Sequence, residues 1–312
     1  MNRLFLALTA LIVCLPLHAG DGQGLSAWRK AGMKKAVDSL YIEVPEYPRI
    51  ARTWNNLRFS RMDISLGTTD FHLRSGIQDQ QSVGFAWRGL GLNAGLNLSK
   101  ASQRWITLGI NSNTAGITVA FQQNADMTDG NHSYAVTTAR ASTYFAFNHR
   151  KYSYNAAVRR AFIQKRSAGS AVVSANACYA LMQRTNPEYD FWNIAPEEGY
   201  LRNLQVSAGI GYGYNFVFGP DNGFLFHIGA IPQIVFLNKS RILDPNLKQL
   251  DNVYVGKLGA GFTASTAFHY SWADRYVLGI SMINTSLRAP YTTGSSIFTR
   301  EYLAQLFFEF RF

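Results

Sequence analysis

The sequence predicts an all-β protein, a transmembrane antiparallel β-barrel in which the strands run up and down in chain order. Three observations predict this class: an N-terminal export signal, long segments with a period of two residues, and a C-terminus rich in phenylalanine. Composition agrees, since 47% of the 312 residues are hydrophobic and 14% are aromatic, but only 16% are charged. A disordered chain would contain fewer apolar residues. Beyond the N-terminus we find no apolar run of about 18 residues, the length that predicts a membrane-spanning helix.

Residues 1–19 have the features of a secretory signal peptide. Arg3 precedes a mainly apolar run from Leu4 to Leu17, and Ala19 offers a small residue at which cleavage can occur. The run is too short to span a hydrocarbon core of about 30 Å as a helix. We therefore expect export, with removal of this segment.

The mature chain is predicted to have two parts. Residues 20–54 do not alternate; they include a basic stretch that fits either an amphipathic helix on an anionic membrane surface or a short soluble helix, followed by extended chain. Residues 55–312 are predicted to form the barrel. Cleavage removes Cys14 and leaves Cys178 without a partner thiol, so neither an internal disulfide nor a cysteine metal cluster is expected.

Residues 203–218 show the alternation most clearly. Even-numbered residues from Leu204 to Phe218 are apolar or aromatic, while the odd-numbered ones are mostly small or polar. Soluble sandwiches also alternate, but their strands average only about five or six residues. Membrane barrels need an apolar outer face and a polar inner face over about ten residues. The pattern therefore favours a membrane barrel.

The C-terminal strand repeats this pattern. Even-numbered residues from Tyr302 to Phe312 share a face and are mainly apolar. In a soluble protein such a strand would be an aggregation hazard. A final strand that ends in phenylalanine resembles the terminal strand of bacterial outer-membrane proteins, which implies that Phe312 is an assembly signal for the barrel-assembly machinery.

Twelve strands are expected, with an alternative of fourteen, because bacterial barrels have even numbers of strands. The segment 81–98 could instead form two strands that meet at Gly89. The expected strands are 56–74, 81–98, 103–111, 115–124, 138–149, 152–164, 169–183, 202–218, 223–238, 254–271, 274–288 and 299–312.

Loop lengths predict an orientation if both ends of the barrel lie in the periplasm. The connections expected there are short: 165–168, 219–222 and 272–273. The connections expected outside are long: 184–201, 239–253 and 289–298. Segment 125–137 departs from this rule, because it is long and yet falls on the periplasmic side. Either the strand assignment is wrong there, or the segment is a periplasmic excursion.

Three stretches resemble one family. They are FAFNHRKYSYNAAVRRAFIQKRSAGS (145–170), GYGYNFVF (211–218) and DSLYIE (38–43). They are similar to a Bacteroidetes group of predicted outer-membrane proteins, domain-of-unknown-function family 4421. The resemblance covers most of residues 38–312. It implies an outer-membrane location and a barrel architecture, and it supplies no catalytic residues.

Polar residues at inward positions are the candidate lumen residues, since they could pair across the barrel and close it. They are Arg159, Glu301, Glu309 and Arg311. An acidic and aromatic group in the expected outer loop 184–201 could bind a sugar or a cation, or simply cover the barrel mouth. This group is Glu188, Tyr189, Asp190, Phe191 and Trp192.

The sequence offers little sign of catalysis. Its histidines are scattered, and we find no GxSxG motif and no phosphate-binding loop. We therefore expect no enzyme activity and no cofactor. The net charge of +11, or +10 without Arg3, fits contact with lipopolysaccharide and other outer-membrane lipids better than with nucleic acid, which the compartment excludes.

The leading hypothesis is an outer-membrane barrel that is structural or offers a narrow passage to small solutes. One alternative is a lipid-acting enzyme, which would need a lumen-facing serine and histidine within hydrogen-bond distance. The other is a barrel that binds ligands through the outer loops 184–201 and 239–253.

Overall fold

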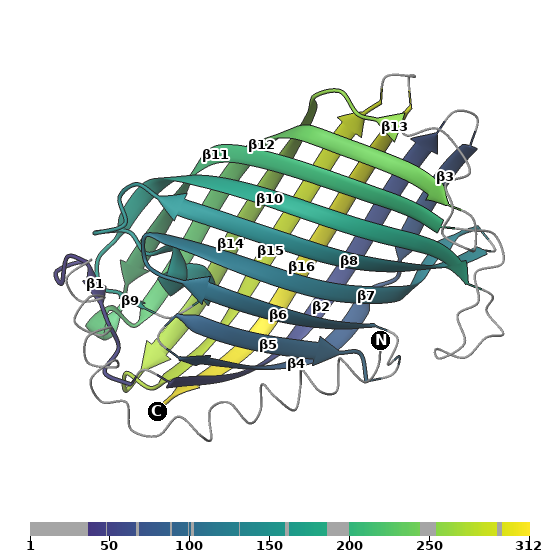
Figure 1. Cartoon of the computed structure of the whole chain (residues 1–312). Coiled ribbons are helices and arrows are strands. Elements are labelled where there is room, and N and C mark those ends of the chain that lie inside the picture. Colours follow the sequence, from purple (N-terminus) through teal and green to yellow (C-terminus); the bar gives the residue numbers. More distant parts are fainter. Residues whose placement is uncertain are drawn as a thin grey trace, which may run out of the picture.

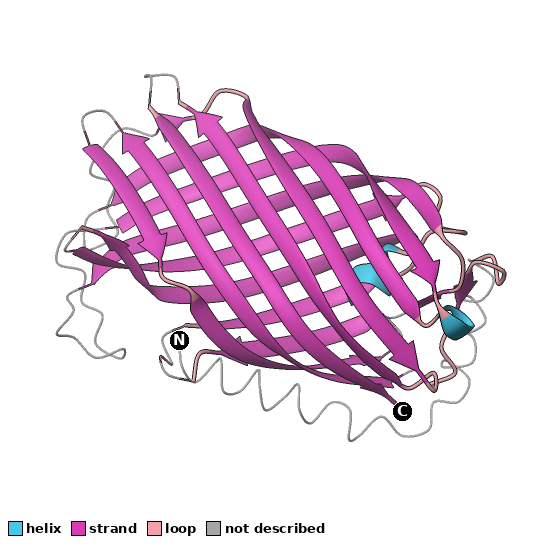
Figure 2. Cartoon of the chain, turned by 180° about the vertical axis from the view of Figure 1, so that it is seen from behind, coloured by secondary structure: helices cyan, strands magenta, loops and turns pink. Residues whose placement is uncertain are grey.

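The computed structural model forms a closed antiparallel β-barrel (Figures 1 and 2). It describes residues 37–47, 49–66, 69–87, 89–98, 100, 103–130, 132–159, 162–185, 200–243, 254–291 and 295–312. Within these ranges twelve strands close the wall, and each is hydrogen-bonded to the next along the chain. The expected fold class is confirmed.

The wall closes where the last strand pairs with the first. In order, its strands are β2 (Arg49–Leu66), β4 (Gln78–Trp87), β5 (Leu90–Leu96), β6 (Arg104–Asn111), β7 (Ala115–Asp129), β8 (His132–Ala146), β10 (Ala168–Thr185), β11 (Tyr200–Phe218), β12 (Phe224–Leu243), β14 (Gly259–Trp272), β15 (Tyr276–Pro290) and β16 (Ser296–Arg311). Two short strands extend the wall. They are β3 (Thr69–Ser75), which pairs with β2 and β7, and β13 (Tyr254–Val255), which pairs with β12.

The strand number agrees with the expectation, but three of the twelve expected strands differ from the structure. Segment 56–74 contains the end of β2 and most of β3, which pair with each other antiparallel. Segment 81–98 contains parts of β4 and β5, so the alternative of two strands that meet at Gly89 is confirmed. This turn needs glycine, because φ is +87° there and a Cβ would lie 2.0 Å from the carbonyl oxygen of Asn111. The barrel also begins earlier than residue 55, since β2 starts at Arg49.

Segment 152–164 is not a wall strand. It contains a π-helical turn, Asn155–Arg159, and strand β9 (Ile163–Gln164), which pairs with β1 (Ile42–Glu43). Its alternating tyrosine, alanine and valine residues resembled a strand, but Tyr152 and Ala157 are wholly buried. A segment that is packed on all sides inside the barrel needs apolar residues, but these residues need not alternate with a period of two as they do in a wall strand.

The division of segment 81–98 into two strands also changes the assignment of segment 125–137. The additional strand before it reverses its side, so the β7–β8 hairpin lies at the end opposite the C-terminus. Of the two explanations for this segment, the wrong strand assignment is therefore confirmed. The long connection at the C-terminal end is instead 147–167.

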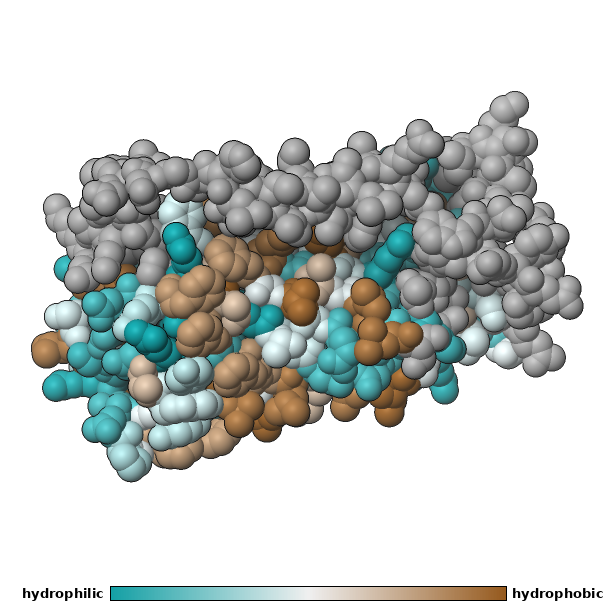
Figure 3. Space-filling model, turned by 90° about the horizontal axis from the view of Figure 1, so that it is seen from below, coloured by the Kyte–Doolittle hydropathy of each residue, from teal (hydrophilic) through white to brown (hydrophobic). Residues whose placement is uncertain are grey.

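The two faces of the wall differ as the alternation predicted. On β11, Ile210 is 59% exposed on the outside, whereas Gln205 and Asn215 are buried inside. Figure 3 shows apolar patches on the face seen from below, with polar residues between them. Near the C-terminal end, the outer face carries a belt of stacked rings. This belt includes Phe218, Phe224, Phe268, Tyr270, Trp272, Tyr276, Phe308, Phe310 and Phe312.

The expected signal peptide lies outside the described residues, and so does almost all of the expected basic helix. None of the helices in the described part of the chain is long and apolar enough to cross a membrane.

Candidate functional site in the barrel interior

A three-residue ion-pair group, which we call the clamp, crosses the barrel. Glu301 points inward from β16, and its Oε1 lies 3.0 Å from Nε of Arg58 on the neighbouring strand β2. Its Oε2 lies 3.0 Å from Nη2 of Arg140 on β8. Strand β8 is separated from β16 by several strands in both directions around the wall. The clamp therefore joins opposite walls of the barrel.

The clamp lies in a polar interior that still has internal space. The side chains of Arg58 and Glu301 are 11% and 17% exposed, while that of Arg140 is 38% exposed. Since the wall encloses all three residues, this exposure reflects small spaces inside the barrel. Cys178, the free cysteine of the described residues, faces Arg140 from the paired position on β10. Two arginines and one carboxylate leave the clamp with a net positive charge.

The other predicted lumen residues lie apart from the clamp. Glu309 and Arg311 are buried near the C-terminal end, and Oε1 of Glu309 lies 3.6 Å from Nε of Arg52. Arg159 belongs to the π-helical turn, so its assignment to a wall strand was wrong. The described residues do not include its side chain.

The remaining predicted residues divide between the described and undescribed parts. Phe312 closes the barrel seam: its backbone nitrogen donates to the carbonyl oxygen of Arg49 at 2.9 Å, and its ring stacks 5.7 Å from that of Phe310. The candidate binding loop lies outside the described residues; it comprises Glu188, Tyr189, Asp190, Phe191 and Trp192.

Segment 147–167, which we call the plug, packs into the C-terminal end of the barrel. Its helical turn lies within the barrel outline in Figure 2, and Ser153 and Asn155 are wholly buried. Asn215 of β11 holds the plug, since its Nδ2 donates to the carbonyl oxygen of Ser153 at 2.9 Å and to Oε1 of Gln164 at 3.2 Å. Residues 37–43 cover it through the β1–β9 pair. This end of the barrel is therefore filled.

The same asparagine belongs to a serine–histidine–asparagine chain that sequence reasoning missed. Its Oδ1 lies 2.8 Å from Nδ1 of His227, and Nε2 of His227 lies 3.1 Å from Oγ of Ser265. Because an amide oxygen only accepts, Nδ1 carries the proton, and Nε2 of the neutral ring accepts from the serine. This is the hydrogen-bond order of a nucleophile, a base and an orienting group.

Burial limits the access of a substrate to this serine–histidine–asparagine group. Asn215 and His227 are wholly buried and Ser265 is 9% exposed. The rings of Tyr152 and Tyr154 from the plug lie 6.5 and 6.1 Å from that of His227. Access for a substrate would require movement of the plug. One sequence signal could have indicated this group. Asn215, His227 and Ser265 are inward polar residues on three neighbouring wall strands, β11, β12 and β14.

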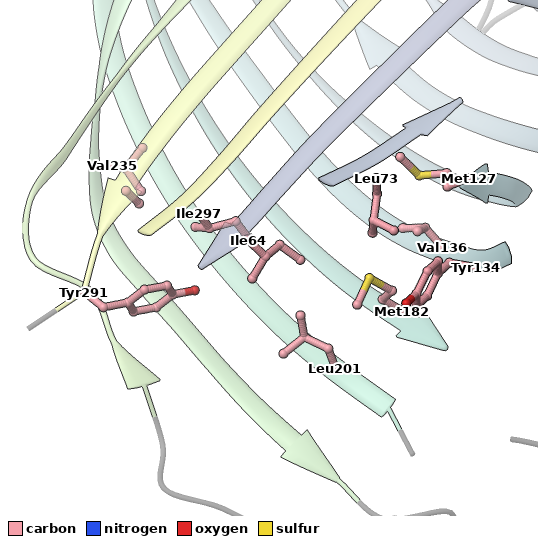
Figure 4. Packing of buried hydrophobic residues seen from close by; sticks show 11 residues of the cluster. Ile64, Leu73, Met127, Tyr134, Val136, Met182, Leu201, Val235, Tyr291 and Ile297 are labelled. Carbon is pink, nitrogen blue, oxygen red and sulfur yellow. The ribbon is translucent and has the colours of Figure 1, made fainter. Parts of the chain in front are cut away.

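At the opposite end, buried apolar side chains from strands all around the wall meet inside the barrel (Figure 4). We call this group the apolar cluster. It comprises Ile64, Leu73, Met127, Tyr134, Val136, Met182, Leu201, Val235, Ala289, Tyr291 and Ile297. These residues are at most 7% exposed, so their side chains are packed against one another at this level.

Metal chemistry has no evident site among the described residues, where no three histidine, cysteine, aspartate or glutamate side chains are grouped to hold an ion.

Several solved barrels have a similar fold at low identity. The outer-membrane protease OmpT of Escherichia coli matches with a TM-score of 0.42 and 7% identity, over 86% of this chain and 98% of that one. The translocator domain of the autotransporter NalP from Neisseria meningitidis matches with a TM-score of 0.34 and 8% identity, over 93% of this chain and 96% of that one. The toluene transporter TodX of Pseudomonas putida matches with a TM-score of 0.34 and 10% identity, over 86% of this chain and 90% of that one. Such distant likenesses assign no activity.

The curated proteins contain no match to this chain. A family model described as "Domain of unknown function (DUF4421)" matches residues 36–312. This match confirms the family resemblance seen in the three sequence stretches, and the chain belongs to the DUF4421 family.

Proposed function

We propose that the protein is an integral barrel of the outer membrane whose resting lumen is closed, and that its role is structural rather than that of an open pore. The apolar exterior, the polar interior and the aromatic belt support membrane residence, because this distribution matches a lipid-facing wall around a polar lumen. We further propose that outer-membrane lipids, lipopolysaccharide and the barrel-assembly machinery are its partners, and that a signal peptide directs its export.

The clamp is the main observation that supports a closed lumen. A twelve-stranded wall leaves more interior room than an eight-stranded one, whose side chains fill the barrel, but less than a porin of 16–18 strands. Glu301 uses this room to hold Arg58 and Arg140 from opposite walls. The apolar cluster above the clamp and the plug below it add two further barriers within the described residues.

Single-channel recording of the refolded protein in a planar bilayer tests this proposal. We expect no steady conductance from the wild type. We also expect none from Glu301→Gln alone, because the plug and the apolar cluster stay in place. Steady, anion-preferring conductance of the wild type would contradict closure and favour the narrow passage, with Arg58 and Arg140 lining it.

A lipid-acting hydrolase is the second candidate function, and the Ser265–His227–Asn215 chain favours it. In such an enzyme Ser265 would attack an ester carbonyl while His227 takes the hydroxyl proton. Its test is labelling of the membrane-inserted protein with a fluorophosphonate, with Ser265→Ala as the matched control. Labelling of the wild type alone would establish a reactive serine. If neither the wild type nor Ser265→Ala is labelled, the serine–histidine–asparagine group is a structural link between wall and plug.

Ligand binding by the outer loops remains the third proposal. Most of both loops, 184–201 and 239–253, lies outside the described residues, so the described contacts add no support to it.

A further inference from the structure

Three arginines form a row on the outer face of the wall, toward the end opposite the C-terminus. Arg74 on β3 pairs with Arg61 on β2, and Arg61 pairs with Arg300 on β16. Their side chains point outward, because the alternate positions, such as Leu73 and Ile64, are buried inside. Like charges at directly paired positions destabilise a sheet. An anion lying over the row would relieve this repulsion.

One acidic residue forms an ion pair with the middle arginine of the row. Asp63 forms an ion pair with Arg61, with Oδ2 2.7 Å from Nη2, and its other oxygen lies 3.3 Å from Nδ1 of His72. Asp70 also points outward nearby, and so does Asp79, which is paired with Leu57. Asp129 has the same alternation as buried Met127, and its Oδ2 accepts from the backbone nitrogen of His72 at 3.1 Å. Exposed Arg288 adds a fourth cation on β15.

Arg300 is held in a position suited to contact with a ligand. Its Nε donates to Oγ of Ser286 at 3.1 Å, and its guanidinium lies 5.3 Å from the ring centroid of Tyr302 and 5.9 Å from that of Phe298. These contacts orient the group while leaving further N–H donors, since arginine has five. The side chain is therefore ordered before any ligand arrives.

An apolar groove of about 430 Å³ lies next to the arginine row on the same outer face. Phe59 and Tyr302 form its near edge, two positions along β2 and β16 from Arg61 and Arg300. Leu57 and Ala304 follow two positions further, and the small side chain of Ala304 leaves a depression between its larger neighbours. The volume falls within the range of about 300–1,000 Å³ that is usual for ligand sites.

We propose that the row and the groove together bind a phosphate-bearing glycolipid of the lipid A class from the outer leaflet. One acyl chain lies in the groove, and the phosphate lies over Arg61 and Arg300. Guanidinium groups bind phosphate through paired, charge-assisted hydrogen bonds, while burial of a hydrocarbon chain stabilises the complex through the apolar contact area. The inference rests on the membrane residence proposed above, and it names a binding site on that membrane-facing wall.

Native mass spectrometry can test the site with the full-length barrel in nanodiscs that contain lipid A or its dephosphorylated form. Three variants accompany the wild type. Arg61→Gln with Arg300→Gln removes charge from the row, and Ala304→Phe fills the groove but leaves the arginines in place. Arg202→Gln with Arg241→Gln is the matched control. It changes another pair of arginines in direct register on the wall, and neither residue lines the groove.

We expect the wild type to retain lipid A after transfer to detergent, and the dephosphorylated form to be retained far less. The row variant and the groove variant should each lower the retained fraction by roughly tenfold, the loss expected when a charge-assisted contact or a well-fitted chain is removed. The control should match the wild type. Equal retention by all four proteins, or an equal loss in the control, would overturn the proposal.

Heat-modifiable mobility in nanodiscs without lipid A separates this result from the proposed function. A protein that inserts there but retains no lipid A refutes the site alone. A protein that never inserts refutes membrane residence, and the lipid site with it.

Discussion

Loss of the clamp carboxylate should destabilise the barrel measurably. Glu301→Gln keeps the shape of the side chain but leaves Arg58 and Arg140 facing each other inside the wall without their carboxylate. Removing one partner of a buried ion pair typically costs about 3–5 kcal/mol. Arg140 is 38% exposed to internal space, so water screens part of its charge, and we expect a loss at the low end, about 3 kcal/mol.

Urea unfolding in phospholipid vesicles, followed by tryptophan fluorescence, would measure this loss. Asp79→Asn is the control, because it removes an exposed carboxylate from the outer face of the wall, where the loss of a charge should not destabilise a barrel in lipid. Arg140→Gln, alone and combined with Glu301→Gln, completes a double-mutant cycle. A Glu301→Gln variant as stable as the control, or a coupling energy near zero, would refute the view that the clamp holds opposite walls together.

Three further perturbations test the seam, the plug and one turn. Deletion of Phe312 removes its hydrogen bond to Arg49 and its ring stacking, so the amount of heat-modifiable barrel in the outer membrane should fall; an unchanged amount would count against the assembly-signal prediction. Asn215→Ala removes the hydrogen bonds that hold the plug and should cost about 1–3 kcal/mol in the same urea assay, whereas a neutral result would show that apolar packing alone retains the plug. Gly89→Ala places a Cβ 2.0 Å from a carbonyl oxygen at positive φ; we expect a loss of about 1–3 kcal/mol in stability, and wild-type stability would contradict the glycine requirement at this turn.

Much of the wall could be predicted because its two faces meet different surroundings. On β11 and β16, alternate residues are apolar outside and mostly polar inside, a pattern that local sequence carries in full. The expected strand number agreed with the structure only because two errors cancelled. Gly89 divides one expected strand, and the residues of the plug imitate another.

The interior contacts could not be predicted in the same way. Glu301 was identified as an inward residue, but its partner Arg140 was not, because alternation reports which face a residue occupies and not which strand lies across the lumen. The same limit hid the link from Asn215 through His227 to Ser265, whose members were individually unremarkable polar residues.

The sequence by itself therefore determined the barrel class, the outward and inward faces, and the family. Only the tertiary structure decided which inward groups meet, where the plug lies and which outward arginines stand in one row. The physical reason is that a period of two is a local response to lipid on one side and a polar interior on the other. Pairing across a lumen, or along three neighbouring strands, depends on register and closure, which are set by the whole wall together.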